Sequence, residues 1–236
     1  MILPKGKGLE PKELLMEMAK PYLDFGLQTN RGEQMIAFWG TEVGLVKNTV
    51  QPILESMVQH RYALGGGVLK LNLMATTLPA VPVSGYRRII ACRSGQESFE
   101  EFCDPDGTPL LLAPASHLGE QEMAVDMAVS ELPAFRRFYG EMLGLTALGE
   151  DCFVWGKTQI RLAKSSDVST SLAPYGPGIR YITFQIRNLD AVHAKLLAAG
   201  VQEFMAPTQL NSVAYISFVL DPDNNLVELA QRSDLQ

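Results

Sequence analysis

Glu228 is the carboxylate whose surroundings most suggest chemistry. It lies in VLDPDNNLVELAQ, where an acidic turn leads into a strand and apolar residues flank the glutamate. A carboxylate on an otherwise buried strand costs free energy unless something pairs with it. Three interpretations stay open: a general acid or base in a dry site, a metal ligand, or a structural residue that pairs with Arg161 or Arg180 or reaches solvent.

Polar side chains near the middle of the N-terminal half are candidates for binding a substrate. Lys70 and Asn72 alternate along KLNL and therefore share one face of the predicted strand. His60 precedes them in VQHRYAL. Together these residues suit an anionic or carbonyl-bearing ligand.

Further candidates lie on strands of the C-terminal half. Tyr215 and Ser217 share one face of the strand predicted at 213–220 and would line the same cavity. Trp155, in CFVWGK, either stacks on a planar ligand or packs in the core. His193 is predicted on the surface of a helix and is not a candidate.

An internal repeat supplies the elements that position these residues. MIAFWGTEVGL matches FRRFYGEMLGL, with Phe38 over Phe138, and each copy predicts a helix after an alternating strand. FCDPDGTPLLLAP matches VLDPDNNLVELAQ, with Asp104 over Asp221. The offsets of 100 and 117 residues make the N-terminal copy 17 residues shorter, which is about one helix and its turn.

The repeat predicts a chain of two tandem domains. Residues 123–232 contain the order strand, helix and three strands twice. Residues 21–114 contain this βαβββ order once clearly, followed by a degenerate second module that lacks its helix. Residues 115–122 form a linker, and residues 1–20 contain a short amphipathic helix from about Pro11.

The helix ending F-Y-x-x-x-L-G-L and the strand entering D-P-D-x-N-x-x-E-L resemble the vicinal oxygen chelate superfamily. This superfamily groups glyoxalases, fosfomycin and bleomycin resistance proteins, methylmalonyl-CoA epimerases and extradiol dioxygenases. The resemblance covers residues 122–232 well and 20–114 partially. It implies an α+β fold in which βαβββ modules pair and their mixed sheets curl into funnels, but it does not fix the chemistry.

The metal-dependent members of the superfamily hold a divalent ion with two histidines and a glutamate. Carried over to this sequence, the glutamate position is Glu228, whereas the two histidine positions fall at Ala124 and Tyr181. The equivalent positions in the N-terminal copy are Asp24, Arg88 and Leu111. The resemblance therefore implies a site without the standard ligands, and we expect no cofactor.

Tyr181 and Asp126 join Glu228 as catalytic candidates. If the superfamily register holds, Tyr181 points into the funnel, where a phenol can donate to a carbonyl or an enolate. Asp126 lies two residues from Ala124 and faces the same side of its strand. With His60 it could also replace the missing histidines and bind a divalent metal.

The leading functional hypothesis is a metal-independent lyase or isomerase that acts on a small organic molecule. One alternative is a non-catalytic protein that binds or sequesters a small molecule, as bleomycin resistance proteins do. The other is a metal-dependent glyoxalase or dioxygenase with substituted ligands.

Composition restricts the partners. A net charge of −6 and a pI of about 5.2 argue against nucleic acid and anionic membranes. No apolar stretch reaches the ~20 residues that span a bilayer. The chain has three cysteines without C-x-x-C spacing, as expected for free thiols in the cytoplasm. We therefore expect a small-molecule partner, and a homodimer stays open.

Overall fold

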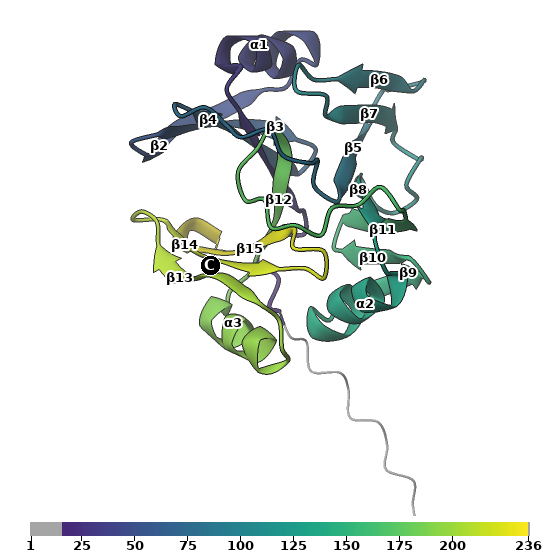
Figure 1. Ribbon diagram of the computed structural model, residues 1–236. Coiled ribbons are helices and arrows are strands. Elements are labelled where there is room, and N and C mark those ends of the chain that lie inside the picture. The colour runs from purple at the N-terminus through teal and green to yellow at the C-terminus, as the bar shows by residue number, and fades with distance from the viewer. Residues whose placement is uncertain (1–15, 236) are drawn as a thin grey trace, which may run out of the picture.

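The chain folds as four consecutive modules (Figure 1). The computed structural model describes residues 16–235. The first module contains one helix and four strands: β1 (Asp24–Thr29), α1 (Gly32–Ala37) with the π-helical turn η1 (Phe38–Glu42), β2 (Lys47–Leu54), β3 (Met57–Leu64) and β4 (Gly67–Met74). The second contains strands alone: β5 (Tyr86–Arg93), β6 (Glu100–Cys103) and β7 (Pro109–Pro114).

The third and fourth modules repeat the βαβββ order. The third is β8 (Met123–Val129), α2 (Leu132–Arg136) with the π-helical turn η2 (Arg137–Met142), β9 (Thr146–Gly149), β10 (Cys152–Trp155) and β11 (Thr158–Lys164). The fourth is β12 (Gly178–Gln185), α3 (Leu189–Ala198), β13 (Glu203–Gln209), β14 (Ala214–Leu220) and β15 (Leu226–Arg232), followed by a short 3-10 turn at Ser233–Leu235. The expected α+β fold of repeated βαβββ modules is confirmed.

The modules pair across the halves of the chain. The first sheet joins the first and fourth modules in the order β13-β14-β15-β12-β1-β4-β3-β2. The second sheet joins the second and third modules in the order β6-β7-β5-β8-β11-β10-β9. An antiparallel pair lies at the centre of each sheet, β1 with β12 and β5 with β8. Each sheet therefore takes one module from each predicted domain, a pairing that the sequence leaves open.

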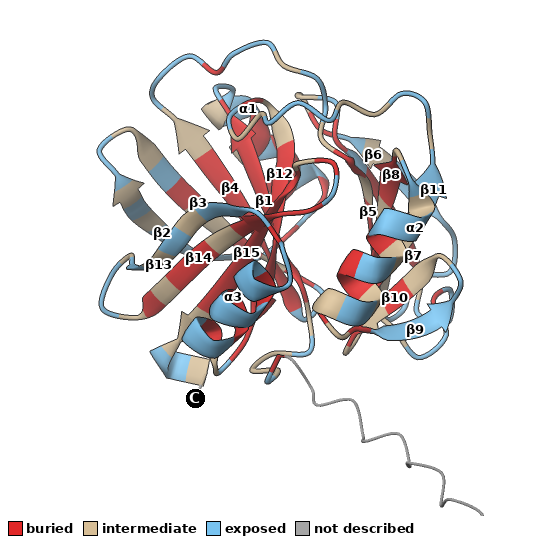
Figure 2. Ribbon diagram, turned by 60° about the horizontal axis from the view of Figure 1, so that its bottom comes forward, coloured by how far each residue is buried: buried red, intermediate tan, exposed pale blue. Residues whose placement is uncertain are grey.

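The two faces of each sheet have different roles. We call the face that packs on the helices and the other sheet the outer face; it supplies the main core, with Phe25, Tyr62, Val125 and Phe184 fully buried. We call the opposite face the inner face. Figure 2 shows buried residues concentrated in the central strands β1, β4, β12 and β15, and exposed residues on the edge strands β2 and β13.

Glycine ends the first helix of each half in the same way. Gly44 and Gly144 have φ values of 71° and 72°, in the left-handed region that suits glycine at a helix C-terminus. The aromatic pairs before them, in FWG and FYG, face the core. The repeat found in the sequence therefore corresponds to one helix with its C-terminal turn.

Two local predictions need comment. The first half of the predicted N-terminal helix, residues 11–15, lies outside the described residues, and residues 16–20 are not helical. Met18 bridges to Ile186 of the first sheet, and the buried Met16 anchors this segment. In residues 86–114, β5 is followed by a turn and β6, without the helix of a full module. Among the described residues, no helix is long and apolar enough to span a bilayer.

Candidate functional site

Glu228 lies on the inner face of the first sheet beside a buried lysine. The register of β12 with β15 places Thr183 next to Glu228, and Lys70 reaches both from β4. Lys70 Nζ donates to Glu228 Oε2 at 2.5 Å and to Thr183 Oγ1 at 2.7 Å, and the Thr183 hydroxyl donates to the same Glu228 oxygen. The lysine and glutamate side chains are only 5% and 6% exposed. Glu228 therefore obtains the partner that its burial demands.

Burial changes the acidity of the lysine in this pair. Loss of solvation lowers the pKa of Lys70, although the charges of Glu228 and Asp24 act in the opposite direction. Lys70 therefore releases its proton more readily than a solvated lysine does. A lysine that shares a hydrogen bond with a carboxylate can pass a proton along that bond.

Asp24 is a second carboxylate on this face. It accepts hydrogen bonds from Lys20 Nζ at 2.8 Å, from the backbone of Val68 at 2.9 Å and from Gln185 Nε2 at 3.0 Å. Burial alone would raise the pKa of Asp24, but Lys20 and Lys70 hold it below its usual value. Asp24 therefore stays ionised and adds negative charge near Lys70.

Tyr181 lies over the backbone of Gly26. A Cβ atom at Gly26 would be only 2.1 Å from Tyr181 Cζ, so the absence of a side chain there admits the ring. The phenol oxygen accepts a hydrogen bond from Asn72 Nδ2 at 3.1 Å, and Lys70 Nζ lies 5.4 Å from the ring centroid. Burial raises the pKa of Tyr181, and the charge of Glu228 adds to that effect. The phenol of Tyr181 therefore keeps its proton, which is available to donate a hydrogen bond.

Aromatic rings lead from Tyr181 toward the sheet edge. Phe218 meets Tyr181 edge to face at 5.4 Å between ring centroids, and Phe204 on β13 meets Phe218 at 6.3 Å. Tyr181 is buried, Phe218 is half-buried and Phe204 is exposed. The row offers an apolar surface that a planar ligand can contact.

The part of the inner face formed by β3 and β4 is polar. Gln59 Nε2 donates to Asn72 Oδ1 at 2.9 Å, and Arg61 Nη1 donates to Gln59 Oε1 at 2.9 Å. Asn72 therefore connects Tyr181 to the half-buried Arg61. A ligand on this face would meet apolar rings on one side and hydrogen-bonding groups on the other.

Asp126 is not part of this group, because it lies on the second sheet. The register of β8 places it between Arg88 on β5 and Arg161 on β11. Arg88 Nε and Arg161 Nε donate to its two carboxylate oxygens at 2.8 and 2.7 Å. The expectation that Asp126 acts beside Glu228 is therefore wrong in geometry, since the two residues belong to different module pairs. Arg161 is likewise not the partner of Glu228.

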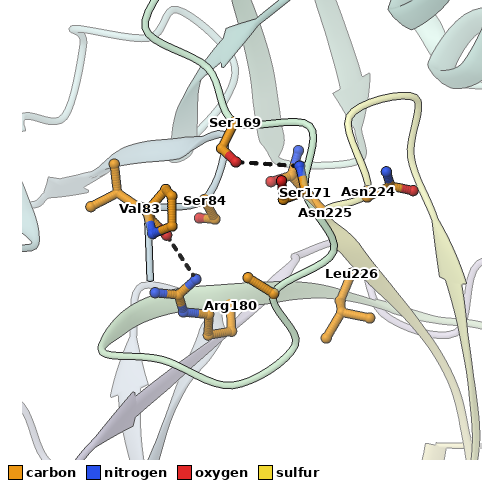
Figure 3. A pocket seen from close by; sticks show the side chains of 10 residues that line it. Val83, Ser84, Ser169, Ser171, Arg180, Asn224, Asn225 and Leu226 are labelled. Carbon is orange, nitrogen blue, oxygen red and sulfur yellow. Dashed lines mark hydrogen bonds between the residues drawn. The ribbon is translucent and has the colours of Figure 1, made fainter. Parts of the chain in front are cut away.

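Arg180 is not the partner of Glu228 either. Its guanidinium donates to the backbone oxygens of Gly176, Pro82 and Pro177 at 2.9, 3.2 and 2.7 Å. Figure 3 shows it directed toward the segment that contains Val83, where a polar cavity of about 20 Å³ lies. That volume suits about one water molecule. Arg180 therefore holds loops together, as its place on the opposite side of the strand from Tyr181 predicts.

His60 faces away from Glu228. It pairs across the strands with Leu71, a core residue, and shares the outer face with Tyr62. Burial, together with the charge of Lys47, lowers the pKa of His60. Lys70 and Asn72 point to the inner face, so strand alternation separates His60 from them.

Tyr215 and Ser217 also lie on the outer face, toward α3. Tyr215 donates to Asp190 Oδ1 at 2.7 Å. Ser217 Oγ lies 3.0 Å from Nδ1 of His193, whose Nε2 lies 2.7 Å from Glu203 Oε2. The expectation of an exposed His193 is wrong, because this buried imidazole joins α3 to β13 and β14. Ser217, at the buried end of this row of hydrogen-bonded side chains, has no exposed surface, so the arrangement is structural.

Trp155 packs in the core between the two sheets. Its ring meets Phe184 edge to face at 5.2 Å, and its Nε1 donates to the backbone oxygen of Lys20 at 3.0 Å. It also borders an apolar cavity of about 370 Å³ that Met16, Leu145 and Leu148 line. Trp155 is thus away from Glu228 and does not contribute to the same surface.

The polar group on the first sheet does not fit a divalent metal ion. A divalent ion needs several lone-pair donors, whereas the nearest group to Glu228 is the ammonium of Lys70, which has none and binds the Oε2 atom. Ala124 and Tyr181, which stand where the resemblance implies histidine ligands, lie on different sheets. The described residues contain no group of three or more His, Cys, Asp and Glu side chains that could hold a metal.

Sequence reasoning missed Thr183, Gln185 and the role of Asp24. Strand alternation could have found Thr183 and Gln185, since they follow Tyr181 at intervals of two residues. The link to Asp24 needs the pairing of β1 with β12, which only the structure provides. Gln185 Oε1 is buried without a hydrogen-bond donor among the described residues, so this face keeps one free acceptor.

Comparison with known proteins identifies relatives of this fold. Residues 120–229 match the model of the Glyoxalase/Bleomycin resistance protein/Dioxygenase superfamily. Glyoxalase I from Zea mays is similar in structure, with a TM-score of 0.69, 13% identity, and coverage of 92% of this chain and 93% of that one. A putative dioxygenase from Bacillus subtilis gives a TM-score of 0.68, 12% identity, and coverage of 92% and 86%. At these identities the structural likeness shows the fold alone. No curated protein sequence matches the chain.

Proposed function

We propose, on the premise that residues 120–229 belong to the glyoxalase, bleomycin resistance protein and dioxygenase superfamily, that this protein acts on a small organic molecule at the inner face of the first sheet. The reaction is a proton transfer of the lyase or isomerase type that proceeds without a metal ion. Glu228 is the acid or base, and Tyr181 is the hydrogen-bond donor to the substrate.

The observation that carries this proposal is the ammonium of Lys70 on the carboxylate of Glu228. The pair is buried, and the Thr183 hydroxyl holds the same oxygen. In such surroundings a cation that belongs to the protein supplies positive charge beside the carboxylate. Electrostatic interactions are stronger there than in water, which favours stabilisation of a developing negative charge.

The chemistry follows from the hydrogen-bond roles of the neighbouring groups. Asn72 donates to the phenol oxygen of Tyr181, which leaves the phenol proton for a substrate carbonyl. Glu228 takes the proton from the carbon next to that carbonyl, and Tyr181 and Lys70 stabilise the enolate that forms. Return of the proton to another position gives an isomer, whereas loss of a neighbouring group gives an elimination product.

A screen of carbonyl compounds by thermal shift, in buffer that contains EDTA, tests this proposal. Compounds that raise the melting temperature are then followed by NMR for conversion. We expect Tyr181→Phe to reduce turnover by about 100-fold, as loss of one such donor does. Trp155→Phe is the matched control, since that aromatic residue lies in the core. Equal turnover in Tyr181→Phe and the wild type would contradict the proposal.

A second candidate function is non-catalytic binding of a small molecule. The burial of Lys70, Glu228 and Tyr181 favours it, because these side chains expose little surface to a substrate, whereas Phe204 is exposed. In that case a ligand contacts Phe204, Phe218 and Arg61 and is not converted. Ligands that bind equally well to Glu228→Gln and are recovered unchanged would support this function.

A further inference from the structure

The second sheet carries a cluster of two arginines around one carboxylate, separate from the site described above. Asp126 on β8 lies between Arg88 on β5 and Arg161 on β11. Nε and Nη2 of Arg88 lie 2.8 and 2.7 Å from Asp126 Oδ2. Nε and Nη2 of Arg161 lie 2.7 and 2.5 Å from Asp126 Oδ1. The three side chains together carry one net positive charge.

Each guanidinium uses only one of its edges on Asp126. The edge formed by Nη1 and the outer N–H of Nη2 has no hydrogen-bond partner among the described residues for either arginine. Arg88 and Arg161 are 38% and 32% exposed, and Asp126 is 24% exposed. The carboxylate therefore fixes the orientation of two guanidinium groups whose remaining donors are accessible to solvent.

Small side chains border one side of this cluster. Ala128 follows Asp126 along β8 at an interval of two residues, and Ala163 follows Arg161 along β11 in the same way. On the other side of the cluster, Ala124 packs with Ile90 in a buried apolar group. Residues that alternate in this way share the inner face of the sheet. Alanine leaves room beside the guanidinium groups that a long side chain would fill.

We propose that the outward edges of Arg88 and Arg161 bind the oxyanion of a small molecule, a carboxylate or a phosphate group. Planar guanidinium forks match the oxygens of both groups, and two forks held by one carboxylate are organised before the ligand arrives. Asp126 is the positioning residue, since it would not touch the ligand. This site lies on the second sheet and does not depend on the function proposed for Glu228.

Titration calorimetry with sodium phosphate and with sodium benzoate tests this site at constant ionic strength set by sodium chloride. The two probes separate a phosphate from a carboxylate ligand. We expect one of them to bind the wild type, and Arg161→Gln and Arg88→Gln each to weaken binding at least tenfold. Arg136→Gln is the matched control, because Arg136 pairs with Asp151 and Glu150 on the surface and should leave binding unchanged.

Asp126→Asn distinguishes positioning from simple attraction by charge. It removes one negative charge, so attraction alone predicts tighter anion binding. Positioning predicts weaker binding despite the added positive charge. Absence of binding by both probes to the wild type would overturn the proposal, as would unchanged binding in both arginine variants or tighter binding in Asp126→Asn. Glu228→Gln should bind the anion as the wild type does.

Discussion

Lys70 and Glu228 form a buried ion pair between strands from opposite halves of the chain, with 2.5 Å between Nζ and Oε2. β4 and β15 lie on either side of the central pair of β1 and β12, so the two residues meet only when the first and fourth modules join. The pair therefore links the formation of the first sheet to the formation of the candidate site.

The ion pair predicts strong coupling between its two residues. Lys70→Met and Glu228→Leu should each lower the free energy of unfolding by about 3–5 kcal/mol, because each leaves a buried partner unpaired. The double variant Lys70→Met, Glu228→Leu should lose much less than the sum of the two single losses. Urea unfolding of all the variants measures this coupling. Additive losses would show that the two side chains do not interact.

Gly26 is predicted to be intolerant of even the smallest side chain. Gly26→Ala should lower stability by about 1–3 kcal/mol, since the new Cβ would overlap the Tyr181 ring and force it to move. Gly149→Ala is the control: Gly149 is likewise a strand residue, the last of β9, but a Cβ there meets nothing within 4 Å. Thermal unfolding compares the two. Equal effects would mean that the ring does not lie on Gly26.

Asp24 predicts a component of stability that acid removes. Its folded pKa lies below the unfolded value of 3.8, so its ionised form stabilises the fold above that pH. This stabilisation is lost as the pH falls through the folded pKa. Asp24→Asn should therefore be destabilised at pH 7 by about 1–3 kcal/mol, and the difference from wild type should shrink toward pH 3. A difference that is constant with pH, measured by urea unfolding, would contradict this assignment.

His193 is predicted to stabilise the packing of α3. His193→Ala removes the link between Ser217 and Glu203 and leaves the buried serine without that partner. The expected loss is about 1–3 kcal/mol of unfolding free energy. His117→Ala, which removes an edge-to-face contact with the exposed Phe99, should cost far less. Similar losses for both histidines, in chemical unfolding, would show that His193 has no structural role.

The repeat and its strand alternation allowed the fold to be predicted. Each half contains a helix that ends in glycine and, further along, a D-P-D turn that leads into a strand. Comparison of the two copies indicated the order of the elements. The same alternation placed Lys70 and Asn72 correctly on one face. These patterns are local, so they survive in a sequence that lacks the usual metal ligands.

Which of the candidate residues share one site could not be predicted, because that depends on which modules pair. In the alignment of the two halves, Leu111 is the equivalent of Glu228. Within the first sheet the equivalent is Lys70 instead, because Lys70 pairs with Gly26 of β1 in the same way that Glu228 pairs with Thr183 of β12. The expectation that Asp126 acts with Glu228 fails for the same reason, since β8 and β15 lie in different sheets. Local pattern also cannot tell which face of β14 is turned toward α3, which decides the place of Ser217.

Solvent deuterium exchange tests the central claim most directly. A carbonyl compound that binds the wild type is incubated in D₂O with EDTA, and NMR follows exchange at the carbon next to the carbonyl. The account predicts exchange by the wild type and loss of exchange in Glu228→Gln. It also predicts that the two proteins bind the compound with affinities within about threefold of each other. Exchange that requires an added divalent metal, or that continues unchanged in Glu228→Gln, would contradict it.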